Sequence, residues 1–290
     1  MAIFSGLAFS CIGYHKNETN MAAPFTSFAI DVVPDPVIPA YAIEAFEKGP
    51  MDENLAVKLG YENLDQLLPY HGVRKVVHRS NFAKTGELVA RVEADDNRPR
   101  VFGVESSLER ATAVAALINP NTFDLHCQPR KVDFQKELDG KKSNTLDFLV
   151  TLKTGEKTYL YVKNDDALSR EETAFITQQI KLGLPAGCGF ATISEASFHP
   201  QVRGNNERIF QAKRFPDPAA DDRMIEVLVD IIDVPEFSIE ELVVRGVGAK
   251  APKREMGRVF DAVLRAIADG DLETDKTRLV DYSTRVRRVS

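Results

Sequence analysis

Two acidic residues and one lysine in the middle of the chain have the residue types and the order of a phosphodiester-cleaving centre. Glu109 lies near the start of a helical pattern, Asp147 precedes a strand-like run, and Lys163 ends the next one. Phosphodiester hydrolysis needs a water nucleophile, charge neutralisation on the phosphate and stabilisation of the leaving oxygen, and a magnesium ion held by carboxylate oxygens supplies much of this. We therefore expect Asp147 to be the principal metal ligand and Glu109 to bind the metal directly or through water. Lys163 would orient the water or neutralise the phosphate.

The same residues also fit ordinary structural roles. An acid at the start of a strand is common, and Glu109 follows Ser106 at the spacing of a helix capping box. The pattern alone leaves both interpretations open.

A mixed sheet flanked by helices is expected to position these residues. A helix is predicted over 106–118, capped by Ser106 or Ser107 and ended by Asn119-Pro120-Asn121. Ser169 is the expected cap of a second helix, and Thr154-Gly155-Glu156 is an expected hairpin turn. The elements that follow the first helix are three strands, a helix and a strand, at 125–134, 145–152, 157–162, 168–182 and 189–193. This order predicts an α/β domain.

Basic residues gather in an expected hairpin ahead of the first helix. Residues 73–79 alternate apolar and basic side chains, as a strand with one basic face would, and residues 88–92 continue as a second strand after a turn at Gly86. This surface is either a solvated sheet face or a phosphate-contacting one. The residues expected to contact DNA under the second interpretation are Arg74, Lys75, Arg79, Lys141 and Lys142.

The two ends of the chain are predicted to lie outside this domain. Residues 1–69 contain a proline-rich arm and a short helical stretch. Residues 204–222 are polar, so we expect a loop there and a boundary between domains at 70–205 and 206–290. The second domain shows the order of a winged helix, with helices at 222–232, 239–244 (capped by Ser238) and 253–268, a stop at Gly270, and strands at 272–274 and 278–281.

Composition narrows the class of protein. The chain has 290 residues, 43% of them hydrophobic, and a net charge of −6, so no strong basic character indicates nucleic-acid binding. Its three cysteines, Cys11, Cys127 and Cys188, lack metal-binding or CxxC spacing, so we expect free thiols and a cytoplasmic protein. The apolar N-terminal stretch is too short to span a bilayer, and no membrane association is expected.

Several of these motifs resemble the TnsA-type transposon endonucleases. The similarity covers roughly residues 70–285 and is carried by Leu108-Glu109-Arg110, Gln128-Pro129, residues 145–150 and Val162-Lys163. It implies a PD-(D/E)XK, restriction-endonuclease-like fold with a C-terminal winged-helix domain that contacts a protein partner. The family's helix acid, strand aspartate and lysine correspond to Glu109, Asp147 and Lys163. The backbone carbonyl of Val162 would be a further metal ligand.

The resemblance also implies an activity and partners. Members of this family cut DNA at mobile-element ends with magnesium, or with manganese in its place, beside a separate transposase and an ATPase regulator. One position departs from the family, since Tyr161 replaces a Glu or Gln that offers a metal-facing oxygen. A tyrosine is neutral at pH 7 and a poor magnesium ligand. Candidate replacements from the next helix are Glu171, Glu172 and Gln178. Self-association is left open.

Three functions therefore stand beside one another. The first is a magnesium-dependent DNA endonuclease. The second is a catalytically degenerate DNA-binding or adaptor protein, which Tyr161 and the modest basicity favour. The third is a transcriptional regulator that reads DNA with the helix at 253–268. Acidic residues interrupt the basic face of that helix, which consists of Lys253, Arg254, Arg258 and Arg265.

Overall fold

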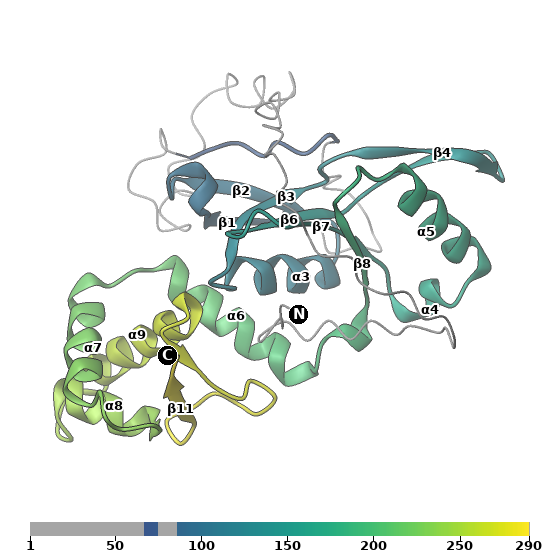
Figure 1. The fold of residues 1–290 in the computed structure, drawn as a ribbon. Helices are drawn as coiled ribbons and strands as arrows, with labels where there is room; N and C mark the ends of the chain where they lie inside the picture. The colour runs from purple at the N-terminus through teal and green to yellow at the C-terminus, as the bar shows by residue number, and fades with distance from the viewer. Residues whose placement is uncertain (1–66, 75–85, 290) are drawn as a thin grey trace.

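A mixed four-stranded sheet forms the centre of the first half of the protein (Figure 1). The computed structural model describes residues 67–74 and 86–289. The strands lie in the order β3 (Thr122–Cys127), β6 (Phe148–Leu152), β7 (Lys157–Val162) and β8 (Gly189–Ile193). β6 pairs antiparallel with β3 and β7, whereas β7 pairs parallel with β8. The predicted α/β class with a mixed sheet is confirmed.

Helices cover both faces of this sheet. Successive side chains of β7 point to opposite faces, so alternate residues of this strand pack against different helices. Leu160 and Val162 lie in the main apolar core, which includes α3 (Ser107–Leu117). Tyr161 lies in a second apolar cluster with residues of α5 (Glu171–Gly183). The helix that carries Glu109 and the helix that backs Tyr161 are therefore on opposite faces of one strand.

Two further hairpins accompany the sheet. β1 (Gly86–Arg91) pairs antiparallel with β2 (Pro99–Val104), and the short 3-10 helix η2 (Glu93–Asp95) lies between them. β4 (Lys131–Leu138) pairs antiparallel with β5 (Lys141–Thr145), and this pair lies against α5. The sequence patterns did not predict β2. The strand at 73–79 was expected to pair with β1 in its place, and most of that segment falls outside the described residues.

Two predicted strands are wrong because the chain turns inside them. The strand predicted over 125–134 is divided into β3 and β4, since Gln128 between them has a left-handed φ of 46° that a regular strand does not contain. The strand predicted over 145–152 is divided at Asp147, between β5 and β6. Both turns lie beside the candidate site, and both separate a hairpin strand from a sheet strand.

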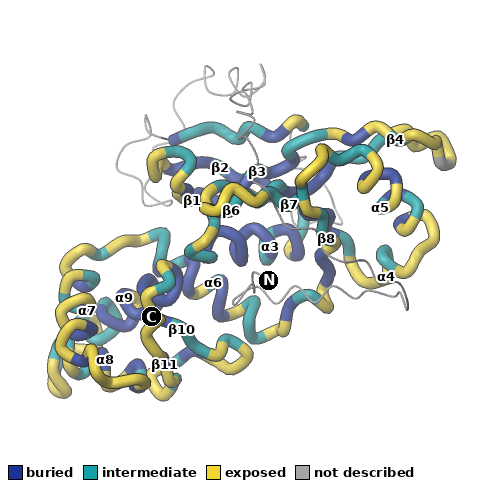
Figure 2. Tube along the Cα trace, viewed as in Figure 1, coloured by how far each residue is buried: buried dark blue, intermediate teal, exposed yellow. Residues whose placement is uncertain are grey.

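The loop predicted over 204–222 is also wrong, because two helices occupy it. α6 (Pro200–Arg214) packs against α3 and α9 (Lys253–Asp269), and α7 (Pro218–Asp230) follows it. Figure 2 shows buried residues along α3, α6 and α9. The predicted domain boundary at 205/206 therefore falls within a continuous helix.

Two of the polar residues that obscured α6 in the sequence, Asn205 and Asn206, are buried. Asn205 is fully buried and donates hydrogen bonds to the carbonyl oxygens of Lys276 and Arg278, at 2.9 and 2.5 Å. Its side-chain oxygen accepts the Val280 N–H at 3.1 Å. A buried asparagine with these partners is satisfied, so a polar sequence here does not indicate a loop.

The C-terminal part contains helices and a small three-stranded sheet. α8 (Ile239–Val247) begins with a capping box at Ser238, as predicted. The strands lie in the order β10 (Leu272–Glu273), β11 (Arg285–Arg288) and β9 (Phe237–Ser238). The wing strand predicted at 278–281 is wrong, because that segment binds α6 through Asn205 and pairing resumes only at β11.

Helix ends and cysteines give mixed results. Ser106 caps α3, and Gly270 ends α9 with a φ of 87°, both as predicted. Ser169 does not cap the start of the second helix: it follows the C-terminal end of the short helix α4 (Asp165–Leu168), which Asn164 caps at its start, and α5 begins without a side-chain cap. The two cysteines in the described part, Cys127 and Cys188, are free thiols. Within the described ranges, no helix has the length and hydropathy needed to cross a bilayer.

Candidate active site

Glu109 is the third residue of α3 and is held at the start of this helix. Its N–H donates to Ser106 Oγ at 3.0 Å, and its Oε2 accepts the N–H of Glu105 at 2.8 Å. The residue is 9% exposed. The contact between Oε1 and Ser106 Oγ is long, at 3.4 Å. The carboxylate therefore stabilises the helix start mainly through Oε2, while Oε1 accepts only the long hydrogen bond from the Ser106 hydroxyl and keeps a lone pair for a ligand.

Asp147 lies at the break between β5 and β6 and is fixed by three hydrogen bonds. Its backbone N–H donates to Leu160 O at 3.2 Å, and its backbone oxygen accepts the Gln128 N–H at 2.7 Å. Its Oδ2 accepts the backbone N–H of Val162 at 2.6 Å. The residue is 6% exposed. Among the described residues no hydrogen bond to its Oδ1 is found, so this oxygen can serve a ligand.

The electrostatics of the two carboxylates show that they belong to one site. Burial raises the pKa of Glu109 to about 7, the Asp147 carboxylate adds to this rise, and Lys163 opposes it. Burial also raises the pKa of Asp147 to about 6, opposed first by Lys163 and then by the Val162 N–H. The two buried acids therefore lie close enough for their charges to interact with each other and with Lys163.

Lys163 continues β7 and lies next to the Tyr161 ring. Its backbone N–H donates to Ile193 O at 3.0 Å, and its Nζ lies 4.5 Å from the ring centroid of Tyr161. Tyr161 is 1% exposed, and burial followed by the Asp147 carboxylate raises the pKa of its phenol well above the usual range. At position 161, where the resemblance predicts a Glu or Gln (the third-acid position), the site thus has a neutral ring that packs under α5.

Sequence reasoning missed an ion pair beside the carboxylates. Glu105, directly before the helix cap, accepts two hydrogen bonds from Arg74, at 2.8 and 2.5 Å. Arg74 lowers the pKa of Asp147, and Glu105 raises it. Arg74 was expected to contact DNA, and it lies at the edge of the site with its side chain 42% exposed. The Glu105 position carried no spacing signal that separates it from an ordinary surface acid.

Gln128 is a second neighbour that the sequence marked only through the Gln128-Pro129 pair. It is 1% exposed, and its backbone oxygen accepts the Val73 N–H at 2.9 Å while its N–H binds Asp147 O. Neither its side-chain oxygen nor its nitrogen has a hydrogen-bond partner within the described part of the chain. Backbone hydrogen bonds therefore connect the turn at Gln128 to the segments of Val73 and Asp147.

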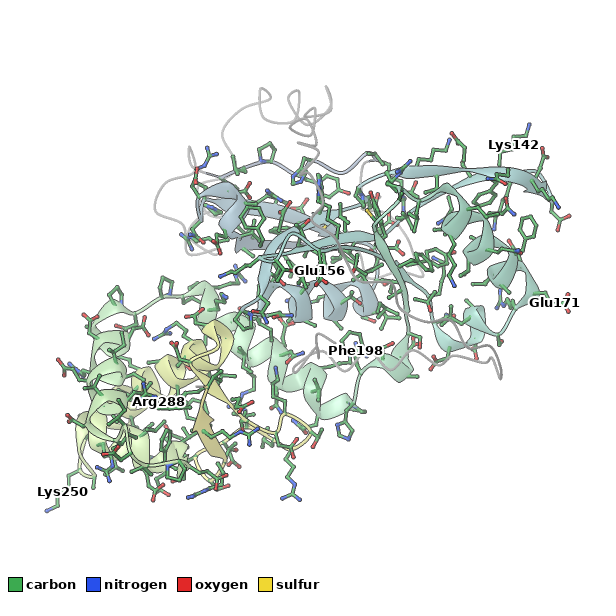
Figure 3. All side chains as sticks on the ribbon, in the orientation of Figure 1. Lys142, Glu156, Glu171, Phe198, Lys250 and Arg288 are labelled. Atoms are coloured by element: carbon green, nitrogen blue, oxygen red, sulfur yellow. The ribbon has the colours of Figure 1, made fainter. Side chains whose placement is uncertain are left out.

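The remaining expected DNA contacts and replacement ligands lie elsewhere. Lys141 pairs with Glu172, and Lys142 lies 3.6 Å from Glu137. Figure 3 shows Lys142 near the tip of the β4–β5 hairpin and Glu171 at the outer edge of α5. Glu171, Glu172 and Gln178, the candidate replacement ligands on α5, are all exposed. Lys75 and Arg79 lie outside the described residues.

The donor set fits a hard divalent cation in kind. Magnesium takes oxygen ligands, commonly one or two carboxylates with several waters, and Glu109 and Asp147 supply two carboxylates with available oxygens. The backbone carbonyl of Val162 was expected as a third ligand. The N–H of the same residue binds Asp147 Oδ2. No group of three or more His, Cys, Asp or Glu side chains in the described ranges could hold a metal ion. The protein ligands would thus be two acids, completed by water.

Comparisons with known proteins add no assignment. No protein-family model matches the chain, and no curated protein matches its sequence. A TnsA-type identity therefore rests on the residues described above and is a proposal.

Proposed function

We propose that the chain is a magnesium-dependent DNA endonuclease of the TnsA type, acting in the cytoplasm. It would cut phosphodiester bonds at mobile-element ends together with a transposase and an ATPase regulator, with manganese as an alternative ion. The observation that carries the proposal is that the buried Asp147 carboxylate binds the Val162 N–H at 2.6 Å, directly before Lys163, and that the buried Glu109 carboxylate interacts with the charges of both Asp147 and Lys163.

Each of the three residues has a role that its environment supports. Magnesium, when bound, would neutralise phosphate charge and lower the pKa of a bound water. Asp147, oriented by the Val162 N–H, would hold the metal through Oδ1. Glu109, whose pKa of about 7 lies near neutrality, is suited to bind the metal or to accept the proton of the attacking water. Lys163 would hold a phosphate oxygen by charge.

The arrangement of elements supports the finer fold assignment. In the first half, α3 and α5 lie on opposite faces of a mixed sheet, and the two acids and the lysine come from a helix start and two neighbouring strands. In the second half, the order α7, β9, α8, α9, β10, β11, with β11 between β10 and β9, supports a winged helix. Both patterns agree with the resemblance.

A catalytically degenerate DNA-binding or adaptor protein is the second candidate, and Tyr161 favours it. The ring is packed in the cluster with Leu146, Ile176 and Ile180 and offers no carboxylate oxygen. Two of the expected DNA contacts, Lys141 and Lys142, also have acidic neighbours. Surface pairs of this kind are weak, so they reduce the local positive potential without preventing DNA contact.

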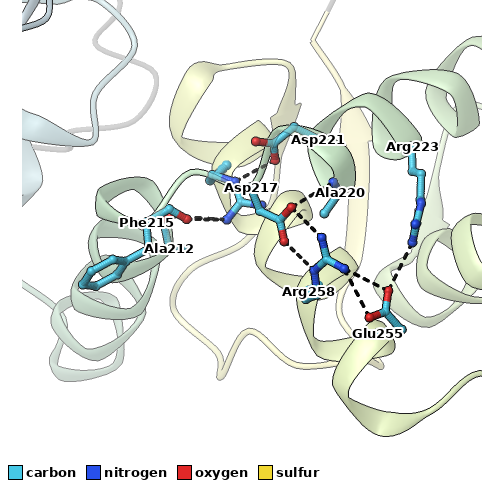
Figure 4. Close-up of polar contacts among 9 residues, drawn as sticks. Ala212, Phe215, Asp217, Ala220, Asp221, Arg223, Glu255 and Arg258 are labelled. Atoms are coloured by element: carbon cyan, nitrogen blue, oxygen red, sulfur yellow. Dashed lines mark hydrogen bonds and ion pairs between the residues drawn. The ribbon is translucent and has the colours of Figure 1, made fainter. Parts of the chain in front are cut away.

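A transcriptional regulator that reads DNA with α9 is less well supported. Arg258 pairs with Asp217 and Glu255, and Arg265 donates to Asp221 and to the Phe215 carbonyl oxygen (Figure 4). The helix also packs against α6 and α7. A recognition helix needs a free basic face in the major groove, and much of this face is used within the protein.

A cleavage assay with a parallel binding assay separates the first two candidates. Purified wild type and Asp147→Ala are incubated with supercoiled plasmid and magnesium or manganese, alone and with the transposase and ATPase partners. The proposal predicts nicked or linear DNA with wild type only, and equal DNA binding by gel shift for both proteins. Plasmid that stays intact with wild type in every combination would reject the endonuclease in favour of the degenerate relative.

A further inference from the structure

Tyr161 contacts the side chain of Lys163 through the face of its ring. Residues 161 and 163 point to the same side of β7 because they are two positions apart. The Tyr161 ring is fixed by burial, with 1% of the residue exposed, among Leu146, Ile176 and Ile180. Lys163 Nζ lies 4.5 Å from the centroid of this ring, within the range of a cation–π contact. A rigid ring therefore lies against a flexible cation at the edge of the site.

The ring restricts where the lysine can go. A lysine side chain has four rotatable bonds and loses much conformational entropy when it is ordered. A buried tyrosine face attracts an ammonium group without neutralising it. A carboxylate at position 161 would instead cancel the charge of Lys163 by forming an ion pair. With tyrosine at position 161, the ammonium charge is not neutralised by an ion pair there. This charge lowers the pKa of both Glu109 and Asp147.

We propose that Tyr161 is a positioning residue, whose buried ring holds the Lys163 ammonium beside Glu109 and Asp147 so that it meets a phosphodiester oxygen. This inference rests on the proposed function for the phosphate, but the contact itself exists without DNA. The tyrosine is then a different solution at the third-acid position: it provides no metal ligand and instead fixes the cation.

The contact has a direct spectroscopic signature. Protons above an aromatic face are shifted upfield, so the Lys163 Hε signals of protein labelled with 13C-lysine should lie upfield of other lysines. Lys163→Met identifies the signals by their loss. Tyr161→Phe keeps the ring and should keep the shift, whereas Tyr161→Leu should move the signals to the ordinary position. Tyr159→Leu, which removes a neighbouring buried ring from the same side of β7, is the matched control and should leave the shift in place.

Cleavage kinetics then test whether the contact matters. Tyr161→Phe should cut at the wild-type rate, and Tyr161→Leu should lose about tenfold in kcat with little change in KM. Tyr161→Leu combined with Lys163→Met should be no slower than Lys163→Met alone, because the ring acts through the lysine. Multiplying losses would show a merely structural ring and overturn the proposal.

The positioning role of Tyr161 and the endonuclease activity can be rejected separately. Lys163 signals at the ordinary position in the wild type would overturn the positioning role, whether or not the protein cuts DNA, and this result needs only the Lys163→Met variant that assigns the signals. An upfield shift that Tyr161→Phe preserves, in a protein without cleavage activity, would confirm the contact and reject the endonuclease alone.

Discussion

Replacing Glu109 by glutamine is expected to make the metal-free protein more stable at pH 8. Glutamine has nearly the size of glutamate and keeps an acceptor oxygen for the Glu105 N–H, so the substitution removes the charge and preserves the shape. The charge is the costly part, because Glu109 is 9% exposed and lies beside the Asp147 carboxylate. The substitution therefore isolates the electrostatic cost of the site.

The size of the effect follows from the pKa of Glu109, which rises from its ordinary 4.5 to about 7 in the folded protein. Because the folded protein holds this proton more tightly than the unfolded chain, the free energy of unfolding falls as the pH rises between these two values. Above about pH 7 the loss is complete, and it is on the order of 3 kcal/mol. Below pH 4.5 both states hold the proton, and the loss disappears.

Urea unfolding in EDTA at pH 8 and pH 5 measures this difference. Glu109→Gln should exceed the wild type by on the order of 3 kcal/mol at pH 8 and by well under half of that at pH 5. Glu240→Gln, which neutralises an exposed acid on α8, is the control and should change the stability by less than ~0.5 kcal/mol at either pH. A variant less stable than the wild type at pH 8, or an equal gain at both pH values, would refute the assigned burial and repulsion.

Three further substitutions test the elements around the site by thermal or urea unfolding. Ser106→Ala removes the cap of α3 and should cost about 1 kcal/mol, and an unchanged midpoint would contradict the cap. Gly270→Ala places a Cβ 2.9 Å from Pro120 at a φ of 87° and should cost more than ~1 kcal/mol, whereas a stabilised variant would contradict this close contact. Arg265→Leu removes a buried guanidinium that binds Asp221 and should cost about 2–3 kcal/mol; a neutral result would show that this pair adds nothing.

The parts of the fold predicted correctly are those specified by neighbouring residues. The helix at 106–118 and the strand at 189–193 have clear apolar periods and become α3 and β8 almost residue for residue. Ser238 and Gly270 act locally as a cap and a stop, and both behave as expected. Such signals need no knowledge of distant contacts, so the sequence alone carries them.

The parts missed depend on contacts between distant residues. α6 contains Gly204, Asn205 and Asn206, which favour loops, yet Asn205 is buried because its partners come from residues 276–280. No local pattern reveals such a partner. The break of the long predicted strand at Gln128 has a similar origin, since this turn binds Asp147 and Val73 from two other segments.

The candidate site shows the same division. Glu109, Asp147 and Lys163 were predicted as a group, and the structure brings their charges close enough to interact. The three candidate replacement ligands on α5 are exposed, and the side chain of one of them, Glu172, pairs with Lys141. Whether the three residues cleave DNA remains a prediction, and Tyr161 is where this chain differs from the pattern that suggested it.

Crystals of the protein soaked in manganese test the proposed metal site most directly. Manganese has the ligand preferences of magnesium and gives an anomalous signal. We predict an anomalous peak about 2.1–2.3 Å from both Asp147 Oδ1 and Glu109 Oε1, with water in the remaining positions and Lys163 Nζ still over the Tyr161 ring. A site without an anomalous peak at saturating manganese, with the two carboxyl groups sharing a proton instead, would contradict a metal-dependent centre.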